Sequence, residues 1–287
     1  MLNWGSEFCE DADAAGAPWH HEGTNLVLDF HGDPARAELC IFSDGNHHMA
    51  LLEAVCAFRK RQGLDAVFYT TTPPGPLVAA LKSGGLQLGN LLLRVRPHVF
   101  ISPEFVLEPM RSAGRLGPIR RLFNSRGNVL IVPAGNPKGI RGIADLARND
   151  LRLFLSNPET EKASYQGYRA TLDACAKRAG IDLGGVTEAD PGRIVYGERI
   201  HHREAARAVA SGAADCAVVY HHLGLRYTRI FPEQLEMVAL EKQGDAQVAS
   251  SHIALIGDGG SWGQSFVDFM IGDEVAEIYR HHGMDAG

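Results

Sequence analysis

Three pairs of adjacent histidines occur at comparable places in the sequence pattern: His47-His48, His201-His202 and His221-His222. Each pair follows a short apolar run and lies at or just before the start of a segment with helical spacing. Converging imidazoles can bind Zn²⁺, Ni²⁺ or Cu²⁺, and Asp44 or Glu198 is near enough in sequence to add a carboxylate oxygen. Histidines can instead donate hydrogen bonds to an anion, which makes the affinity depend on pH near about 6 to 7.

A purely structural role is the third interpretation of these pairs. The chain has 13 histidines, and two further pairs, His20-His21 and His281-His282, lie away from such turns. Adjacent residues at a helix start point about 100° apart, so at most one histidine of each pair should face a ligand. The residues chosen for a metal-binding alternative are Asp44, His47, Glu161, His201 and His221.

The first histidine pair belongs to a predicted strand-turn-helix unit. Leu39 to Phe42 is an apolar strand candidate, Ser43 to Asn46 forms a polar turn, and a helix is expected from about His47 to Arg61, ended by Gly63. Backbone N–H groups at a helix start are unpaired and carry the positive end of the helix dipole. This turn is therefore suited to hold an anion.

A second unit of the same kind follows directly. The pattern predicts a strand at Asp65 to Tyr69, a turn from Thr70 to Gly75 and a short helix from Pro76 to Lys82. Successive β-turn-α units are typical of a doubly wound sheet, in which ligands bind at the carboxyl ends of parallel strands. Both polar turns should therefore lie at one edge of the same sheet.

Length and composition limit the classes of protein. A chain of 287 residues with 45% hydrophobic and 22% charged residues is expected to form two α/β lobes. The net charge of −6 argues against nucleic acid as a partner, because binding to a phosphate backbone needs a basic surface. No run of about 18 uncharged apolar residues is present, so no membrane span is expected.

The N-terminal residues, Met1 to Pro18, show no basic segment followed by an apolar one, so the sequence suggests either a cytoplasmic protein or a chain whose leader has been removed. The cysteines show no close pairing and are expected to be buried thiols; they are Cys9, Cys40, Cys56, Cys175 and Cys216.

The remaining pattern predicts further strands and helices and a division into lobes. Strands are expected at Val99 to Ser102, Asn128 to Pro133, Leu151 to Leu155, Arg193 to Tyr196, Cys216 to Tyr220 and His252 to Ile256. Helices are expected at Met110 to Phe123, around Ile143 to Ala147, and at Tyr165 to Ala179, His202 to Ala210 and Ser265 to His282. Lobe 1 should comprise 25–127 and 238–287 and lobe 2 residues 128–237, after a polar segment 1–24, with Met237 to Leu240 as the return crossing.

Six stretches resemble the substrate-binding proteins of bacterial molybdate and tungstate ABC importers, and the similarity as a whole covers roughly residues 37 to 284 in unbroken order. They are Asn128 to Ile140, Asp145-Leu146, Ser156 to Glu159, Val195 to Glu198, Ala213 to Tyr220 and Phe266 to Gly283. The resemblance implies a type II periplasmic-binding-protein fold. Each lobe would be a mostly parallel sheet flanked by helices, and two crossing strands would join the lobes. Hinge closure would then capture an oxyanion in the interlobe cleft.

The same resemblance implies which positions hold the ligand. In that family uncharged hydroxyls and backbone amides bind the tetrahedral anion. The matching positions here are Asn46 with Ser43 just upstream, the stretch from Thr72 to Gly75, Ala163, Ile200 and Tyr220. Tungstate-selective relatives add carboxylates; Glu161 matches one of these positions, and Val219 stands at the other.

The sequence therefore predicts a monomeric solute-binding protein that captures a molybdate- or tungstate-like oxyanion and has no resident cofactor. Its partner would be an ABC permease, and its location periplasmic or extracellular. One alternative is a transition-metal ion bound through the histidines. The other is an enzyme or cytoplasmic sensor on the same fold, although no G-x-S-x-G, H-E-x-x-H or P-loop pattern is present.

Overall fold

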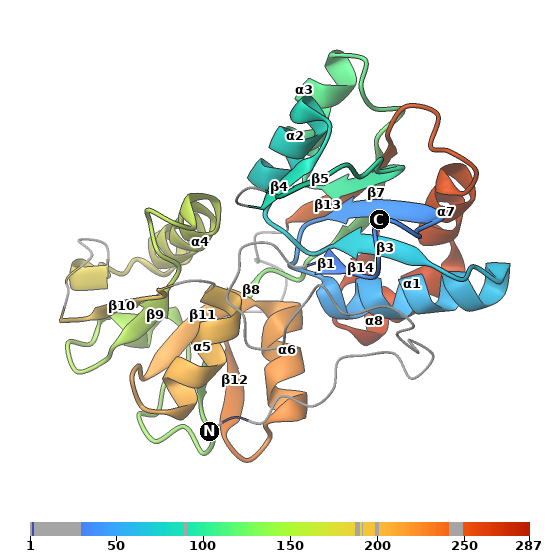
Figure 1. Cartoon of the computed structure of the whole chain (residues 1–287). Coiled ribbons are helices and arrows are strands. Elements are labelled where there is room, and N and C mark those ends of the chain that lie inside the picture. Colours follow the sequence, from blue (N-terminus) through green and yellow to red (C-terminus); the bar gives the residue numbers. More distant parts are fainter. Residues whose placement is uncertain are drawn as a thin grey trace. The chain divides into compact units, whose positions relative to one another are not determined.

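The computed structural model describes residues 2, 30–88, 91–186, 190, 192–198, 201–240 and 249–287. These residues form two compact units. We call residues 30–124 with 249–287 the flanking unit and residues 125–240 the central unit. In Figure 1 the flanking unit is drawn in blue to green and in red, and the central unit in the colours between. Apart from Leu2, the predicted polar segment 1–24 lies outside the described residues.

The flanking unit is built on a seven-stranded sheet with the order β1-β3-β2-β6-β13-β7-β14. Its strands are β1 (Phe30–His31), β2 (Leu39–Ser43), β3 (Val67–Thr70), β6 (Val99–Ser102), β7 (Arg120–Asn124), β13 (Ser250–Leu255) and β14 (Asp285–Ala286). A separate hairpin pairs β4 (Leu86–Leu88) with β5 (Leu91–Leu93). Strands β3, β2 and β6 run parallel, so their carboxyl ends share one edge, as the two strand-turn-helix units predict.

Helices cover both faces of this sheet. They are α1 (His48–Gln62), α2 (Pro74–Ser83), α3 (Glu104–Ser112), α7 (Gly263–Met270) and α8 (Asp273–His281). Side chains alternate along β2, so Leu39 and Ile41 pack in one core with residues of α1, α7 and α8. Cys40 and Phe42 pack in a second core with residues of α2 and α3. The sheet is buried on both faces, which explains its long apolar strands.

Helix α1 confirms the predicted strand-turn-helix unit. It ends at Gly63, whose left-handed conformation (φ 66°) lets its N–H donate to the carbonyl of Arg59. Its buried face contains Leu51, Val55 and Phe58, which recur at helical spacing and lie in the core. Helix α2 begins earlier than predicted, at Pro74, because proline fits the first turn of a helix, where its missing N–H has no intrahelical partner.

The central unit is built on a five-stranded sheet with the order β10-β9-β11-β8-β12. Its strands are β8 (Asn128–Pro133), β9 (Leu153–Leu155), β10 (Ile194–Tyr196), β11 (Cys216–Tyr220) and β12 (Leu235–Ala239). Its helices are α4 (Lys162–Ala179), α5 (His201–Ala210), α6 (His221–Ile230) and the 3₁₀ turns η1 (Ile143–Ala147) and η2 (Gly184–Val186). Strands β10, β9 and β11 are parallel, so this unit also has an edge of carboxyl ends.

Both sheets are mixed, which corrects the expectation of mostly parallel sheets. In the flanking unit β1, β13, β7 and β14 pair antiparallel, and in the central unit β8 and β12 do so. Strand β12, which contains most of the predicted return crossing at Met237 to Leu240, forms a five-residue antiparallel ladder with β8 in the central sheet.

Two predicted helices differ from the structure. The helix expected at Met110 to Phe123 is wrong: α3 ends at Ser112, Gly114 adopts φ 69°, and β7 begins at Arg120 and pairs with β13. The single closing helix expected at Ser265 to His282 is two helices, since the chain is extended at Gly272 (φ −84°, ψ 169°) before α8 begins. Helix α6 was not predicted.

Within the described ranges, no helix combines the length and hydropathy needed to cross a bilayer. The described cysteines are thiols, as predicted, and burial raises the pKa of Cys40 to about 11 and that of Cys216 to about 12. Cys9 lies outside the described residues.

Candidate functional site

The carboxyl ends of β3, β2 and β6 bring four polar residues into neighbouring positions. The register pairs Ser43 with Ile101, so Asp44 and Ser102 come next on adjacent strands, and the Asp44 N–H donates to the Ile101 carbonyl at 3.3 Å. On the other side, the Thr72 N–H donates to the Ser43 carbonyl at 2.9 Å. We call Ser43, Asp44, Thr72 and Ser102 the flanking edge; all four are buried.

A chain of hydrogen bonds runs behind this edge. The Ser43 hydroxyl donates to the Asp44 carbonyl and lies 3.0 Å from His47 Nε2, while His47 Nδ1 lies 2.7 Å from the Tyr279 hydroxyl. Because Ser43 uses its only proton on the carbonyl, His47 Nε2 must carry a proton and donate it to Ser43. The hydroxyl of Ser43 is thus fully engaged within the protein.

Asp44 is the ionisable group of the flanking edge. Its side chain is nearly inaccessible, and one carboxylate oxygen lies 3.8 Å from His47 Nε2. Burial raises the pKa of Asp44 to about 7, against the smaller opposing effect of a hydrogen bond from the Asn46 backbone N–H. Asp44 therefore changes charge near neutral pH.

Ser102 lies beside Asp44 and was not among the predicted site residues. Its hydroxyl oxygen is buried, and no described residue forms a hydrogen bond with it. A buried polar atom without a partner costs about 1–3 kcal/mol, so such an atom points to a missing ligand or water. The sequence signal was a serine that closes an apolar strand just before a proline.

The corresponding edge of the central unit contains a second such hydroxyl. Ser156 directly follows β9, is 0% exposed, and its hydroxyl has no hydrogen-bond partner among the described residues. The turn after it is fixed by Asn157, whose side-chain oxygen accepts from the N–H groups of Glu159 and Thr160. This turn leads into α4, with Glu161 as the residue preceding the helix.

Glu161 links the starts of two helices. Its carboxylate accepts a hydrogen bond of 2.8 Å from the backbone N–H of His201, the first residue of α5. Burial raises the pKa of Glu161 to about 7, the bond from His201 lowers it, and nearby Glu204 raises it. A carboxylate of the chain itself thus occupies a helix start at which a bound anion would otherwise be stabilised.

His201 lies in the core of the central unit. It is 1% exposed, its ring is stacked on Phe154 at 5.4 Å and tilted against Tyr168 at 4.8 Å, and burial lowers its pKa to about 3. His47 is likewise buried, whereas His48 and His202 are only partly so. The choice of His47 and His201 as the ligand-facing members of their pairs is therefore not supported by their burial.

Tyr220 and His221 lie at the junction of β11 and α6. Tyr220 is partly exposed, and its ring contacts those of Tyr168 at 5.4 Å and His222 at 5.4 Å. The backbone N–H of His221 donates to the Gly127 carbonyl at 2.9 Å. We call Ser156, Glu161, His201 and Tyr220 the central edge.

The other predicted positions are more scattered. Asn46 is partly buried in the turn before α1, Gly75 is exposed in the first turn of α2, and Ala163 is the second residue of α4. Ile200 lies outside the described residues. Among the residues with assigned positions, no group of three or more His, Cys, Asp or Glu side chains is placed to hold a metal ion.

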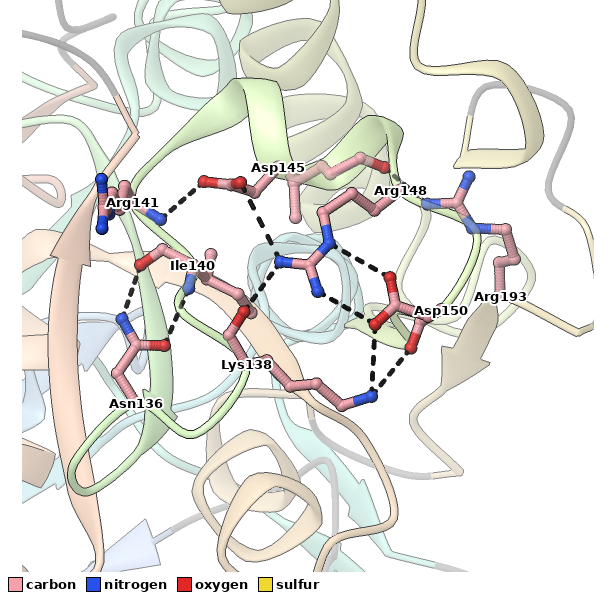
Figure 2. Close-up of polar contacts among 9 residues, drawn as sticks. Asn136, Lys138, Ile140, Arg141, Asp145, Arg148, Asp150 and Arg193 are labelled. Carbon is pink, nitrogen blue, oxygen red and sulfur yellow. Dashed lines mark hydrogen bonds and ion pairs between the residues drawn. The ribbon is translucent and has the colours of Figure 1, made fainter.

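The sequence motif that begins the resemblance has a structural role of its own. Figure 2 shows the Asn136 side chain bridging its loop, since its amide donates to the Ile140 carbonyl at 2.7 Å and its oxygen accepts from the Ile140 N–H at 2.9 Å. Arg148 continues the network by donating to the Lys138 carbonyl and to the carboxylate of Asp150. These contacts stabilise the loop after β8.

Comparison with known proteins agrees with this fold. Residues 39–285 match the family of bacterial extracellular solute-binding proteins. A stretch of 118 residues is 35% identical to the uncharacterized protein YvgK of Bacillus subtilis (strain 168), covering 39% of this chain and 34% of YvgK. The match thus spans about a third of that relative's length.

Three solved structures illustrate the structural likeness. The periplasmic molybdate-binding protein of Azotobacter vinelandii is 18% identical (TM-score 0.60; 87% of this chain, 100% of that chain). The sulfate-binding protein SubI of Mycobacterium tuberculosis H37Rv is 17% identical (TM-score 0.63; 86% of each chain). Iron-bound HitA of Pseudomonas aeruginosa is 17% identical (TM-score 0.59; 84% of this chain, 82% of that chain). At these identities the likeness concerns the fold alone.

The match to the family covers nearly all of the chain that the structure describes, and the two α/β units agree with it. The chain belongs to the family of bacterial extracellular solute-binding proteins and has the two-lobed type II periplasmic-binding-protein fold.

Proposed function

We propose that this protein captures a small tetrahedral oxyanion, with molybdate and tungstate as the first candidates, and delivers it to an ABC permease. The observation that carries the proposal is a pair of buried hydroxyls, Ser102 at the flanking edge and Ser156 at the central edge. They are two of the three serine hydroxyls that are buried without a hydrogen-bond partner in the described structure, and the third is that of Ser251 on β13. Ser102 and Ser156 each lie at the carboxyl end of a strand in a parallel set, which is where this class of fold binds its ligands.

Uncharged donors suit an oxyanion that must be both held and released. A hydrogen bond to a charged group contributes about 1.5–3 kcal/mol, and several such donors bind a dianion without a buried counter-charge. The start of α4 adds the positive end of an 18-residue helix near Ser156. The similar fold of the molybdate- and sulfate-binding proteins supports the same class of ligand.

A transition-metal ion is the second candidate. The carboxylates of Asp44 and Glu161 stand at the two edges, and HitA, of similar fold, was solved with iron bound. A ligand that is bound mainly by the carboxylates, and not by the hydroxyls, would be a cation.

Calorimetric titration with molybdate, tungstate, sulfate and phosphate, and separately with Zn²⁺, Ni²⁺ and Fe³⁺, separates these candidates. Ser102→Ala and Ser156→Ala should each weaken oxyanion binding by roughly 10- to 100-fold, the loss expected for one hydrogen bond to a charged group. Matched controls are Ser83→Ala in the flanking unit and Ser211→Ala in the central unit, two exposed serines whose hydroxyls only bond nearby carbonyls.

The two candidates predict opposite outcomes. If no oxyanion binds, or if both serine variants bind as the parent does, the oxyanion proposal is wrong. Binding of a metal ion that is lost in Asp44→Asn or Glu161→Gln but kept in the serine variants would replace it with the second candidate.

A further inference from the structure

Strand β13 places a histidine directly opposite Ser102. The register of β6 with β13 pairs Ser102 with His252, and the register of β7 with β13 pairs His252 with Arg121. Residues opposed on antiparallel strands lie on the same face of a sheet, so the three side chains form a row across three adjacent strands. We call Ser102, His252 and Arg121 the polar row.

The neighbours of Ser102 and His252 identify the face on which the polar row lies. Side chains two positions apart on a strand share a face. Phe100, two positions before Ser102, and Ala254, two positions after His252, both belong to the core that packs against α2 and α3. Ser102 and His252 therefore lie at the carboxyl end of β6, on the side of the sheet that α3 covers.

Strand β7 contributes Arg121 to the same face. Ile119, just before β7, packs against the core with α2 and α3, whereas Arg120 Nη1 lies 3.6 Å from Asp268 Oδ1 on α7, which belongs to the core on the opposite face. Alternation then places Arg121 on the face of Ile119. Arg121 is exposed, and its charge acts on His252, which agrees with this placement.

Two atoms of the polar row are buried without a hydrogen-bond partner. Ser102 is 0% exposed and His252 is 7% exposed, and in the part of the chain that the structure describes neither Ser102 Oγ nor His252 Nδ1 forms a hydrogen bond. These residues are opposed on paired strands, yet their side chains do not bond to each other. A third group that bonds to both would therefore satisfy two buried atoms at once. The buried hydroxyl of Ser251, by contrast, is opposite the apolar Phe123.

The chemistry of the polar row suits a negatively charged oxygen. Burial lowers the pKa of His252, Glu104 raises it and Arg121 lowers it, so the net shift is downward and the ring is neutral at pH 7, with one N–H. Glu104 Oε2 is 3.8 Å from His252 Nε2, beyond hydrogen-bond distance, so this proton is available at Nδ1. Ser102 donates its O–H, and the guanidinium of Arg121 carries a positive charge.

Resting on the proposed function, we infer that Ser102 and His252 bind the same oxygen of the captured oxyanion, and that Arg121 supplies the positive charge that makes the site select anions. Adjacent strands are about 4.8 Å apart, so an oxygen held between Ser102 and His252 is within reach of the long side chain of Arg121. His252 and Arg121 are thus ligand-binding residues, and Arg121 disfavours a metal cation at the same place.

Substitutions at His252 test which ring nitrogen binds the ligand. His252→Asn places its amide near the position of Nδ1, and His252→Gln places it near that of Nε2. The probe is whichever of molybdate, tungstate, sulfate and phosphate the parent binds most tightly in calorimetric titration. His252→Asn should bind it within about threefold of the parent, whereas His252→Gln and His252→Leu should bind it about 10- to 100-fold more weakly. Equal losses in all three variants would indicate a structural role and overturn the inference.

The double variant Ser102→Ala with His252→Leu tests whether both residues bind one oxygen. Two donors to a shared oxygen are coupled, so the fold-loss of the double variant should be smaller than the product of the two single losses. A loss equal to that product would show that Ser102 and His252 act independently and would refute the shared oxygen.

Arg121 and Arg120 are adjacent arginines on opposite faces of the sheet and provide a matched pair. Arg121→Met should weaken binding of the same oxyanion by about 3- to 10-fold at low salt, and the difference should shrink at high salt because Arg121 is exposed to screening ions. Arg120→Met should leave the affinity unchanged. Equal effects of the two substitutions would mean that only the net charge of the protein matters, which would refute a local role for Arg121.

The outcomes distinguish this inference from the function on which it rests. Absence of binding of every oxyanion to the parent protein would refute the proposed function. Binding that is weakened in Ser102→Ala but unchanged in His252→Leu and Arg121→Met would leave the function standing and refute the polar row. Arg121→Met replaces an exposed side chain, so this test does not depend on the folding of a variant with a changed core.

Discussion

His47 Nδ1 lies 2.7 Å from the hydroxyl oxygen of Tyr279, a residue 232 positions later in the chain. This contact joins the turn before α1 to α8 within the flanking unit, and Phe123 packs against both rings at 4.9 and 5.0 Å. Tyr279→Phe should lower the free energy of unfolding by about 1–2 kcal/mol, because it leaves a buried ring nitrogen without its partner.

Urea denaturation of Tyr279→Phe, His47→Leu and the double variant measures this contact. The double-mutant cycle should give a coupling free energy of about 1 kcal/mol. Strict additivity of the two single variants would show that the hydrogen bond contributes nothing.

His201 should make the central unit sensitive to acid. Its pKa is about 3 in the folded protein and near 6.5 when unfolded, so between these values the unfolded state binds the extra proton. Stability should therefore fall as the pH drops below 6.5, by up to about 1.4 kcal/mol per pH unit. His201→Leu should unfold at a higher temperature than the parent at pH 5 but not at pH 8, and the exposed His281→Gln should show no such difference.

Asp44 should lower the stability of the unliganded protein at high pH, whereas His201 lowers it at low pH. Its folded pKa of about 7 lies above the ordinary value of 3.8, so the folded state keeps a proton that the unfolded state has released. Stability then falls as the pH rises from about 4 to 7 and stays lower above that, by about 4 kcal/mol at most. In thermal melts Asp44→Asn should exceed the parent at pH 8 and match it at pH 4. Equal melting temperatures at both values would show that Asp44 is not desolvated.

Asn136 should be required for the loop after β8. It adopts a left-handed conformation (φ 44°) and makes two hydrogen bonds with Ile140. Asn136→Ala loses both bonds and keeps the backbone strain, so we expect a loss of about 2–3 kcal/mol in chemical denaturation. Asn136→Gly relieves the strain and should lose less; a larger loss for glycine would mean that strain plays no part.

Gly224 and Gly167 provide a matched pair of helical glycines. A Cβ at Gly224 in α6 would lie 2.7 Å from Val129 Cγ2, whereas one at Gly167 in α4 would meet nothing within 4 Å. Gly224→Ala should therefore destabilise the protein by about 1–3 kcal/mol through overpacking. Gly167→Ala should stabilise it by up to about 1 kcal/mol through helix propensity. Two changes of the same sign would contradict the packing of α6 on β8.

Local sequence patterns correctly predicted those strands and helices whose formation depends on residues close by in the sequence. The apolar run from Leu39 followed by Ser43 to Asn46 was sufficient for β2 and α1, because a buried strand and a helix start each have a local signature. The prediction for the region around Arg120 was wrong because the structure there depends on residues far away in the sequence. Its arginines imitate a helix face, while its true partner, β13, lies more than 120 residues later. Helix α6 was missed because Gly224 lowers helix propensity, and only packing against Val129 and Met237 explains it.

The sequence predicted the positions of the polar turns but not the contacts of their side chains. The polar turns after β2 and β9 lie where the order of the predicted elements placed them. The sequence of a histidine pair, however, does not show which of the two side chains faces a ligand and which is buried in the core. His47 turned out to be held by Tyr279, and His201 by Phe154 and Tyr168. The local signal at Ser102, a serine at the end of an apolar strand before a proline, does not reveal that its hydroxyl lacks a partner, because that lack is a property of the assembled sheet.

The position of β13 also governs the order in which the protein can fold. In the flanking sheet β13 lies between β6 and β7, and β7 pairs with β13 and β14 in the described structure. A nascent chain that has not reached Ser250 can align β2, β3 and β6, but it cannot attach β7 to them. The central sheet, by contrast, has all its strands between Asn128 and Ala239. Completion of the flanking unit is therefore a step that must wait until β13 and β14 have been synthesised.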